Sequence, residues 1–114
     1  MVVAQKYKKP VVLEEFGFPR DVFRFSKSTS TEVRDEYYQY VFDLIRQDRE
    51  NGGLFAGCNF WAWGGFAEQN PEHIYWEKGD DYTGDPAQEE QGLNSVFATD
   101  TTVEIIKTEN AKLK

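Results

Sequence analysis

Residues that build disulfides, thiolate metal sites and nucleophile triads are scarce in this sequence. It contains one cysteine and one histidine, Cys58 and His73. A single cysteine excludes an intrachain disulfide and a zinc site made of several thiolates. Because no serine or cysteine nucleophile motif lies near His73, a hydrolase triad within this chain is disfavoured. We therefore expect no metal and no cofactor, with Cys58 as a small buried hydrophobic residue and His73 at the surface.

Long apolar runs and clustered positive charges are also missing. No stretch of about 18 apolar residues occurs, so no membrane span is expected. The first residues lack the apolar run and the small-residue cleavage site of a signal peptide, and an export signal would lie upstream of them. The net charge is −7 and the lysines and arginines are scattered, which disfavours nucleic acid and anionic membranes as partners.

Aromatic residues, by contrast, are abundant. The 114 residues include 9 Phe, 6 Tyr and 3 Trp, and 39% of the chain is hydrophobic. This is enough apolar surface for one small folded domain and argues against a disordered chain. Aromatic rings pack in cores and also form flat platforms for sugar rings, and we expect core packing for most of them.

The hydrophobic pattern predicts a strand, a helix and a second strand. Residues Pro10–Glu15 contain a continuous apolar run, typical of a strand buried on both faces of a parallel sheet. Residues Leu54–Trp63 are apolar almost throughout and indicate the second strand. An apolar stripe at helical spacing lies between them, made of Val33, Tyr37, Tyr40, Val41, Leu44 and Ile45. This order predicts a βαβ unit with parallel strands.

Short polar motifs predict where the helices begin and end. Thr29 and Glu32 have the spacing of a capping box, so the first helix should begin near them. Gly52 and Gly53 supply its stop, because glycine tolerates the left-handed conformation.

A long polar loop and a final helix complete the chain. Residues 66–95 are rich in Gly and Asp but include aromatic residues, which favours a packed functional loop over a disordered one. Thr101 and Glu104 again have capping-box spacing, and the helix they begin has a modest apolar face of Val103, Ile106 and Leu113.

Two carboxylates, Glu14 and Glu15, end the first predicted strand. Neighbouring side chains on a strand point to opposite faces. In a barrel the carboxyl ends of the strands face the active site, so a carboxylate there is a catalytic candidate. The pattern alone leaves open the alternative in which both project into solvent.

The second predicted strand carries Asn59, Trp61 and Trp63 on one face. A tryptophan at the mouth of a barrel can stack on a sugar ring. For Trp61 sugar stacking and core packing are both open, whereas for Trp63 core packing is favoured. Residues 77–85 are acidic enough for calcium to be conceivable, but their spacing does not match an EF-hand, and a solvated loop is the favoured interpretation.

Together these segments resemble glycoside hydrolase family 5, and within it the β-mannanases. KPVVLEEFGFPRD resembles the seventh-strand segment of that family and GCNFWAWGG resembles its eighth strand. GDPAQEEQGLNSVF followed by DTTVEIIK resembles the tail of the bacterial members. The resemblance runs from about Lys9 to about Lys107.

The resemblance implies an α/β fold, in which residues 1–114 form a single partial domain, the C-terminal quarter of a (β/α)₈ TIM barrel. It implies a retaining endo-β-1,4-mannanase that acts on β-mannan, glucomannan or galactomannan, with a secreted or periplasmic parent. Glu15 would be the catalytic nucleophile, with Glu14 pointing away from the site. Trp61 would line the subsite that binds the reacting sugar.

The family's acid/base glutamate belongs to strand four, which this chain does not contain. We therefore expect the isolated chain to have no useful activity, and its open strand edges predict oligomerisation or dependence on the missing N-terminal barrel portion. Two alternatives stay open. The chain could be a non-catalytic carbohydrate-binding or structural remnant that uses Trp61, Trp63 and Trp76, or a part of a β-1,4-glucanase.

Overall fold

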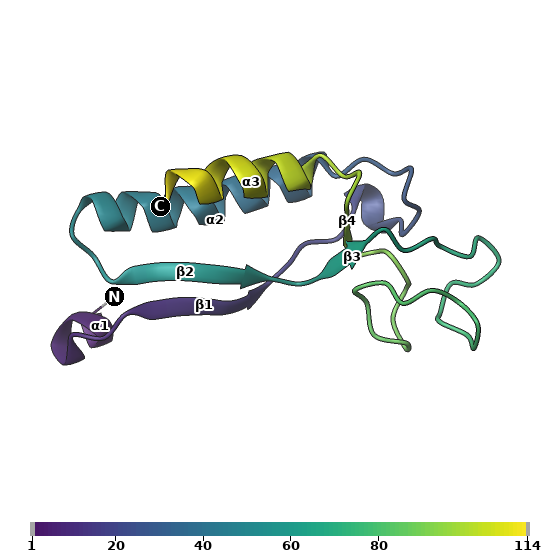
Figure 1. Cartoon of the computed structure of the whole chain (residues 1–114), viewed down its shortest axis with the longest axis horizontal. Helices are drawn as coiled ribbons and strands as arrows, with labels where there is room; N and C mark the ends of the chain where they lie inside the picture. Colours follow the sequence, from purple (N-terminus) through teal and green to yellow (C-terminus); the bar gives the residue numbers. More distant parts are fainter. Residues whose placement is uncertain (1, 114) are drawn as a thin grey trace.

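The computed structural model describes residues 2–113 and arranges its longer strands and helices in two layers (Figure 1). Two parallel strands, β1 (Val11–Phe16) and β2 (Phe55–Phe60), form one layer. Two helices, α2 (Glu32–Glu50) and α3 (Thr102–Lys112), lie side by side over one face of these strands. The predicted βαβ unit with parallel strands is confirmed. The strands are not buried on both faces, because Val12 is 48% exposed on the face without helices.

The second strand ends earlier than predicted. β2 stops at Phe60. From Ala62 onward the backbone no longer pairs with β1 but with the residues at the end of the long loop. The Ala62 amide donates to the Asn94 carbonyl (3.3 Å), and the Val96 amide donates to the Ala62 carbonyl (2.7 Å). A short parallel pair follows, β3 (Trp63–Gly65) beside β4 (Val96–Phe97). The residues after β2 are thereby tied to the end of the long loop.

The start of α2 is capped by a residue distant in sequence. The Asp21 carboxylate accepts hydrogen bonds from the backbone amides of Glu32 (3.2 Å) and Val33 (3.1 Å). The predicted capping box of Thr29 and Glu32 is therefore wrong, because a carboxylate from the preceding loop satisfies the free amides of the first turn. At the other end Gly52 adopts φ +74°, which confirms the predicted glycine stop.

The buried face of α2 is rotated from the predicted stripe. Three members of that stripe, Val33, Tyr40 and Leu44, are exposed. Val41 and Ile45 of the stripe are buried as predicted. The other buried residues of α2 are Arg34, Tyr38 and Phe42. The prediction counted apolar side chains only, so it did not include the buried arginine on this face.

The final helix also begins without a side-chain cap. The Thr101 hydroxyl donates to the Asp35 carboxylate of α2, so the second predicted capping box is wrong as well. The predicted apolar residues of α3 do pack against the core, together with Ile105. Two short elements, α1 (Val2–Tyr7) and η1 (Asp21–Phe23), were not predicted. Among residues 2–113 no helix is long and apolar enough to cross a membrane.

A buried charge cluster joins the loop after β1 to both helices. The side chains of Arg20, Arg34 and Asp100 are almost inaccessible to solvent. Asp100 Oδ2 accepts hydrogen bonds from Arg20 (2.5 Å), from Arg34 (3.0 Å) and from the Phe97 amide (2.7 Å). Burial, with the nearby Arg20, lowers the pKa of Arg34. The cluster fixes the loop that directly follows Glu15.

Candidate active site

The carboxyl end of β1 carries the predicted nucleophile. Glu15 is followed by Phe16, whose ring packs against Tyr38 of α2 with a centroid distance of 4.8 Å. Phe16 is buried in the core under the helices, whereas the Glu15 side chain is exposed and takes no part in that core. In a (β/α)₈ barrel the helices form the outer ring, so the opposite face of the strands is the interior one, and its carboxyl end is the active-site end.

Near its end β1 contains a bulge. The register with β2 shifts between Leu13 and Phe16, both of which pack in the core. Glu14 and Glu15 lie between them and are both exposed. A bulge re-aims the side chains it contains, so simple alternation does not apply across it. The basis for the prediction that Glu14 points away from the site is therefore lost.

Trp61 lies directly beside the end of β1. Its amide donates to the Phe16 carbonyl at 2.6 Å, and its carbonyl accepts from the Tyr38 hydroxyl at 3.4 Å. Gly17 passes so close that a Cβ there would stand 2.5 Å from the Trp61 carbonyl oxygen, so this approach requires glycine. The Trp61 side chain is 39% exposed. The structure thus brings Glu15 and Trp61 to the same end of neighbouring strands.

Two further predictions for the second strand have different outcomes. Trp63 is 53% exposed, so its predicted packing in the core is wrong. It belongs to the short strand that pairs with Val96 rather than to the sheet under α2. Cys58 packs against the core as predicted, and burial raises the pKa of its thiol.

The long loop at this end of the strands is ordered by buried polar side chains. The Asp85 carboxylate accepts from the amides of Gly92 (2.8 Å) and Asn94 (3.1 Å) and from the Ser95 hydroxyl (2.5 Å). The buried Gln91 amide donates to the carbonyl of Pro86 at 2.7 Å. The prediction of a packed loop is confirmed, and Figure 1 shows it lying beyond the carboxyl ends of β1 and β2.

His73 binds two acidic residues in this loop. Its Nδ1 lies 2.8 Å from Asp80 Oδ2 and its Nε2 lies 2.9 Å from the Glu77 carboxylate. The hydrogen bond with Asp80 raises the pKa of His73, and the Glu77 amide lowers the pKa of Asp80. His73 is therefore part of the loop's internal structure rather than a free surface residue. Among residues 2–113 no cluster of three or more His, Cys, Asp and Glu side chains could hold a metal ion.

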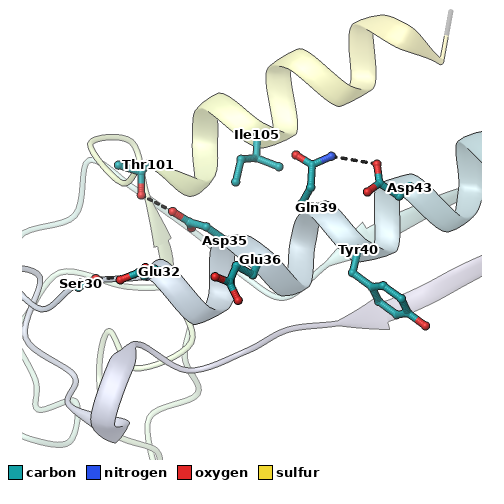
Figure 2. Close-up of a pocket in the computed structure, with 9 residues that line it drawn as sticks. All are labelled: Ser30, Glu32, Asp35, Glu36, Gln39, Tyr40, Asp43, Thr101 and Ile105. Carbon is teal, nitrogen blue, oxygen red and sulfur yellow. Dashed lines mark hydrogen bonds between the residues drawn. The ribbon is translucent and has the colours of Figure 1, made fainter.

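A separate groove lies between α2 and α3. Figure 2 shows its lining, which includes Asp35 and Gln39 of α2 and Thr101 and Ile105 at the start of α3. Neither Glu15 nor Trp61 lines this groove. The concave surface between the helices is therefore distinct from the strand ends that carry the predicted site.

Parallel strands joined by a covering helix, with a carboxylate and an aromatic ring at their carboxyl ends, are the arrangement of one segment of a (β/α)₈ barrel. The protein-family model of the β-mannosidase-like proteins of glycoside hydrolase family 5 matches residues 1–114 of this sequence. The chain belongs to this family. It is also similar to solved structures of the family 5 mannosidase from Rhizomucor miehei, including one of a mutant in complex with mannosyl-fructose. The identity to that mutant is 40% with a TM-score of 0.81, over 96% of this chain.

Curated relatives match over a shorter stretch. The chain is 37% identical over 54 residues to a putative mannan endo-1,4-β-mannosidase P and to mannan endo-1,4-β-mannosidase 3, both from Arabidopsis thaliana. Those matches cover 47% of this chain and 12% of each relative. The chain spans 28% of the Rhizomucor mannosidase. The α/β fold is thus that of part of a family 5 TIM barrel, and the activity of a whole enzyme is a matter for proposal.

Proposed function

We propose that this chain supplies the nucleophile and a sugar platform of a retaining enzyme that hydrolyses β-1,4-mannosidic links. One observation carries the proposal. Glu15 is exposed near the carboxyl end of β1, and Trp61 hydrogen-bonds to the next residue of that strand. A carboxylate beside an exposed indole is suited to a sugar ring whose anomeric carbon faces the carboxylate.

The proposed reaction is a double displacement. The Glu15 carboxylate attacks the anomeric carbon and forms a glycosyl ester, while the bond to the leaving oxygen breaks. A second carboxylic acid protonates that oxygen, then takes a proton from water as the water hydrolyses the ester. In retaining enzymes the two carboxyl groups stand about 5–5.5 Å apart.

The second carboxyl group would come from outside this chain. The family resemblance assigns it to strand four, whereas β1 and β2 resemble strands seven and eight. Without it the leaving oxygen is not protonated, and general acid–base catalysis alone contributes about 10²–10⁴-fold. The isolated chain should therefore be inactive until the remaining strands are supplied.

Two modes of cleavage fit the relatives. We expect cleavage of internal links in β-mannan, glucomannan or galactomannan, the activity named for the two Arabidopsis relatives. The second candidate is removal of terminal mannose, which the β-mannosidase-like description of the family favours. The size of the products from a soluble mannan distinguishes the two modes, because internal cleavage releases long oligosaccharides and terminal cleavage releases mannose. A secreted or periplasmic parent stays a prediction.

Complementation tests the proposal. This chain would be co-expressed with the part of the Rhizomucor miehei mannosidase that precedes the region it matches, and reducing ends released from soluble β-mannan would be measured. Activity should appear only in the mixture, and Glu15→Gln should remove nearly all of it, because an amide cannot form the glycosyl ester. Glu14→Gln is the matched control and should retain most activity. A complex that binds mannan but never hydrolyses it would favour the non-catalytic alternative.

A further inference from the structure

The long loop carries a pair of stacked aromatic rings. The rings of Trp76 and Tyr82 lie 5.2 Å apart at an interplanar angle of 9°. Tyr82 is nevertheless 79% exposed. One face of its ring rests on the indole, so the other face is open to solvent. A stacked pair with one free face is a flat apolar surface held at the tip of a loop.

Hydrogen bonds hold Trp76, the supporting ring of this pair, in place. The Trp76 indole N–H donates to the Asp80 carbonyl at 3.1 Å. The Asp80 carboxylate is itself bound by His73, by the Asn70 amide (3.1 Å) and by the Glu77 backbone amide (3.0 Å). Since the rings are already ordered, binding on the free face would cost little further conformational entropy.

The same loop places the pair close to Trp61. Gly84 packs against Ala62 so closely that a Cβ on the glycine would stand 2.7 Å from the Ala62 Cβ. Ala62 directly follows Trp61, and Gly84 lies two residues beyond Tyr82. Two residues of extended chain reach at most about 7 Å. The stacked pair is therefore anchored next to the strand end that carries the predicted sugar platform.

We propose that Tyr82, supported by Trp76, is a second sugar-binding platform, which binds a further unit of the same β-linked mannose chain. The inference rests on the proposed function for its substrate class. Its ring face would contact the C–H groups of a pyranose, as aromatic platforms do. Asp81 beside it is exposed, and since its Oδ2 accepts from the Glu68 amide at 2.9 Å, its Oδ1 is the atom offered to a sugar hydroxyl. The platform extends the binding surface from Trp61 along the polymer.

A titration with β-1,4-mannopentaose tests the platform. The indole N–H signals of Trp61, Trp63 and Trp76 would be followed by ¹H–¹⁵N NMR, in the 114-residue chain and in the complemented barrel. We expect the Trp76 signal to shift with added sugar. Tyr82→Ala should weaken the Kd at least fivefold, and Tyr82→Phe should leave it nearly unchanged. Tyr7→Ala removes a comparably exposed tyrosine from α1, at the opposite end of the strands, and is the matched control.

The outcomes separate this inference from the proposed function. A Trp76 signal that does not respond in either sample, or responds equally in Tyr82→Ala, overturns the platform even if the barrel hydrolyses mannan. A change of oligomeric state in Tyr82→Ala with unchanged sugar binding would show a protein contact and also overturn it. Sugar binding that depends on Tyr82, in a barrel without Glu15-dependent hydrolysis, would support the platform and contradict the enzyme.

Discussion

Asp100 is the residue on which the buried charges of this chain depend. Its carboxylate accepts hydrogen bonds from two arginines that are 0–1% exposed, Arg20 and Arg34. Replacing it by asparagine would leave two buried guanidinium groups without a counter-charge. Breaking a buried ion pair in this way costs about 3–5 kcal/mol.

We therefore expect Asp100→Asn to destabilise the fold by about 3–5 kcal/mol, measured by urea unfolding. The matched control is Glu104→Gln, which removes a carboxylate from a solvent-exposed pair with Lys107. Exposed pairs contribute little, so the control should keep its unfolding midpoint. Equal effects of the two substitutions would show that the cluster is not the stabilising feature described here.

His73 makes the order of the long loop dependent on pH. Its folded pKa is raised by Asp80, so its stabilising contribution is complete below the unfolded value of about 6.5 and is lost as pH rises through the folded value. Asp80 behaves in the opposite sense, because its folded pKa is lowered and its contribution is lost as pH falls through that value. The loop should be most ordered at mildly acidic pH.

Hydrogen exchange measures this effect when observed rates are divided by the intrinsic rates at each pH. Protection in residues 70–80 should fall over the interval in which pH rises from about 6.5 through the raised folded pKa of His73 in the wild-type chain. In His73→Gln the protection should be lower and should no longer change over that interval. Protection that rises with pH in the wild-type chain would contradict the assignment.

Among the elements, α2 determines how β1 and β2 present their ends. Tyr38 is fully buried, its ring packs against Phe16 and Phe60, and its hydroxyl donates to the Trp61 carbonyl. Burial raises the pKa of the Tyr38 phenol, so it stays neutral in the physiological range. This one side chain therefore contacts both strands directly behind Glu15 and Trp61.

Tyr38→Ala should destabilise the chain by about 3–5 kcal/mol, as for other large aromatic truncations in a core. Tyr38→Phe keeps the ring and loses only a long hydrogen bond, so a loss of about 1 kcal/mol or less is expected. Thermal unfolding of both variants compares the two contributions. A loss in Tyr38→Phe as large as in Tyr38→Ala would show that the hydroxyl, and not the packing, is dominant.

The spacing of apolar residues predicted the main strands and helices because each of them buries the side chains on one face. Val11 and Leu13 identified β1, and Gly52 identified the end of α2. The capping of α2 by Asp21 could not be predicted, since that contact depends on how the preceding loop folds back. Arg34 was missed because its burial depends on Asp100, far away in the chain. The strand end made both Glu14 and Glu15 candidates, and only the family resemblance chose Glu15, whose role stays a prediction. Tyr82 had no signal beyond its residue type and its place in the long loop.

At the scale of the whole molecule, this chain resembles one part of a closed barrel. In the described residues β1 and β2 pair only with each other, so their outer edges are unpaired. Val12 on the open sheet face and Val33, Tyr40 and Leu44 on α2 are further exposed apolar side chains. Unpaired edges and apolar stripes associate with other chains unless they are covered.

The isolated chain should therefore self-associate, and the preceding part of the Rhizomucor miehei mannosidase should replace those contacts with a complex of one copy of each. Light scattering coupled to size exclusion measures both masses. Leu44→Asp should weaken the complex, because it places a charge in the apolar stripe of α2. A heat-stable monomer of the isolated chain would contradict this account of the exposed surfaces.

The central claim is that Glu15 forms a covalent bond to a mannosyl unit. A mannosyl fluoride with fluorine at C2 reacts with retaining enzymes but leaves an ester that water removes slowly, so the labelled residue can be found by peptide mass spectrometry. In the complemented barrel the account predicts one added fluoromannosyl group, on the peptide that contains Glu15, and none in Glu15→Gln. A label that localises to Glu14 or to another residue, or hydrolysis with no label at all, would contradict it.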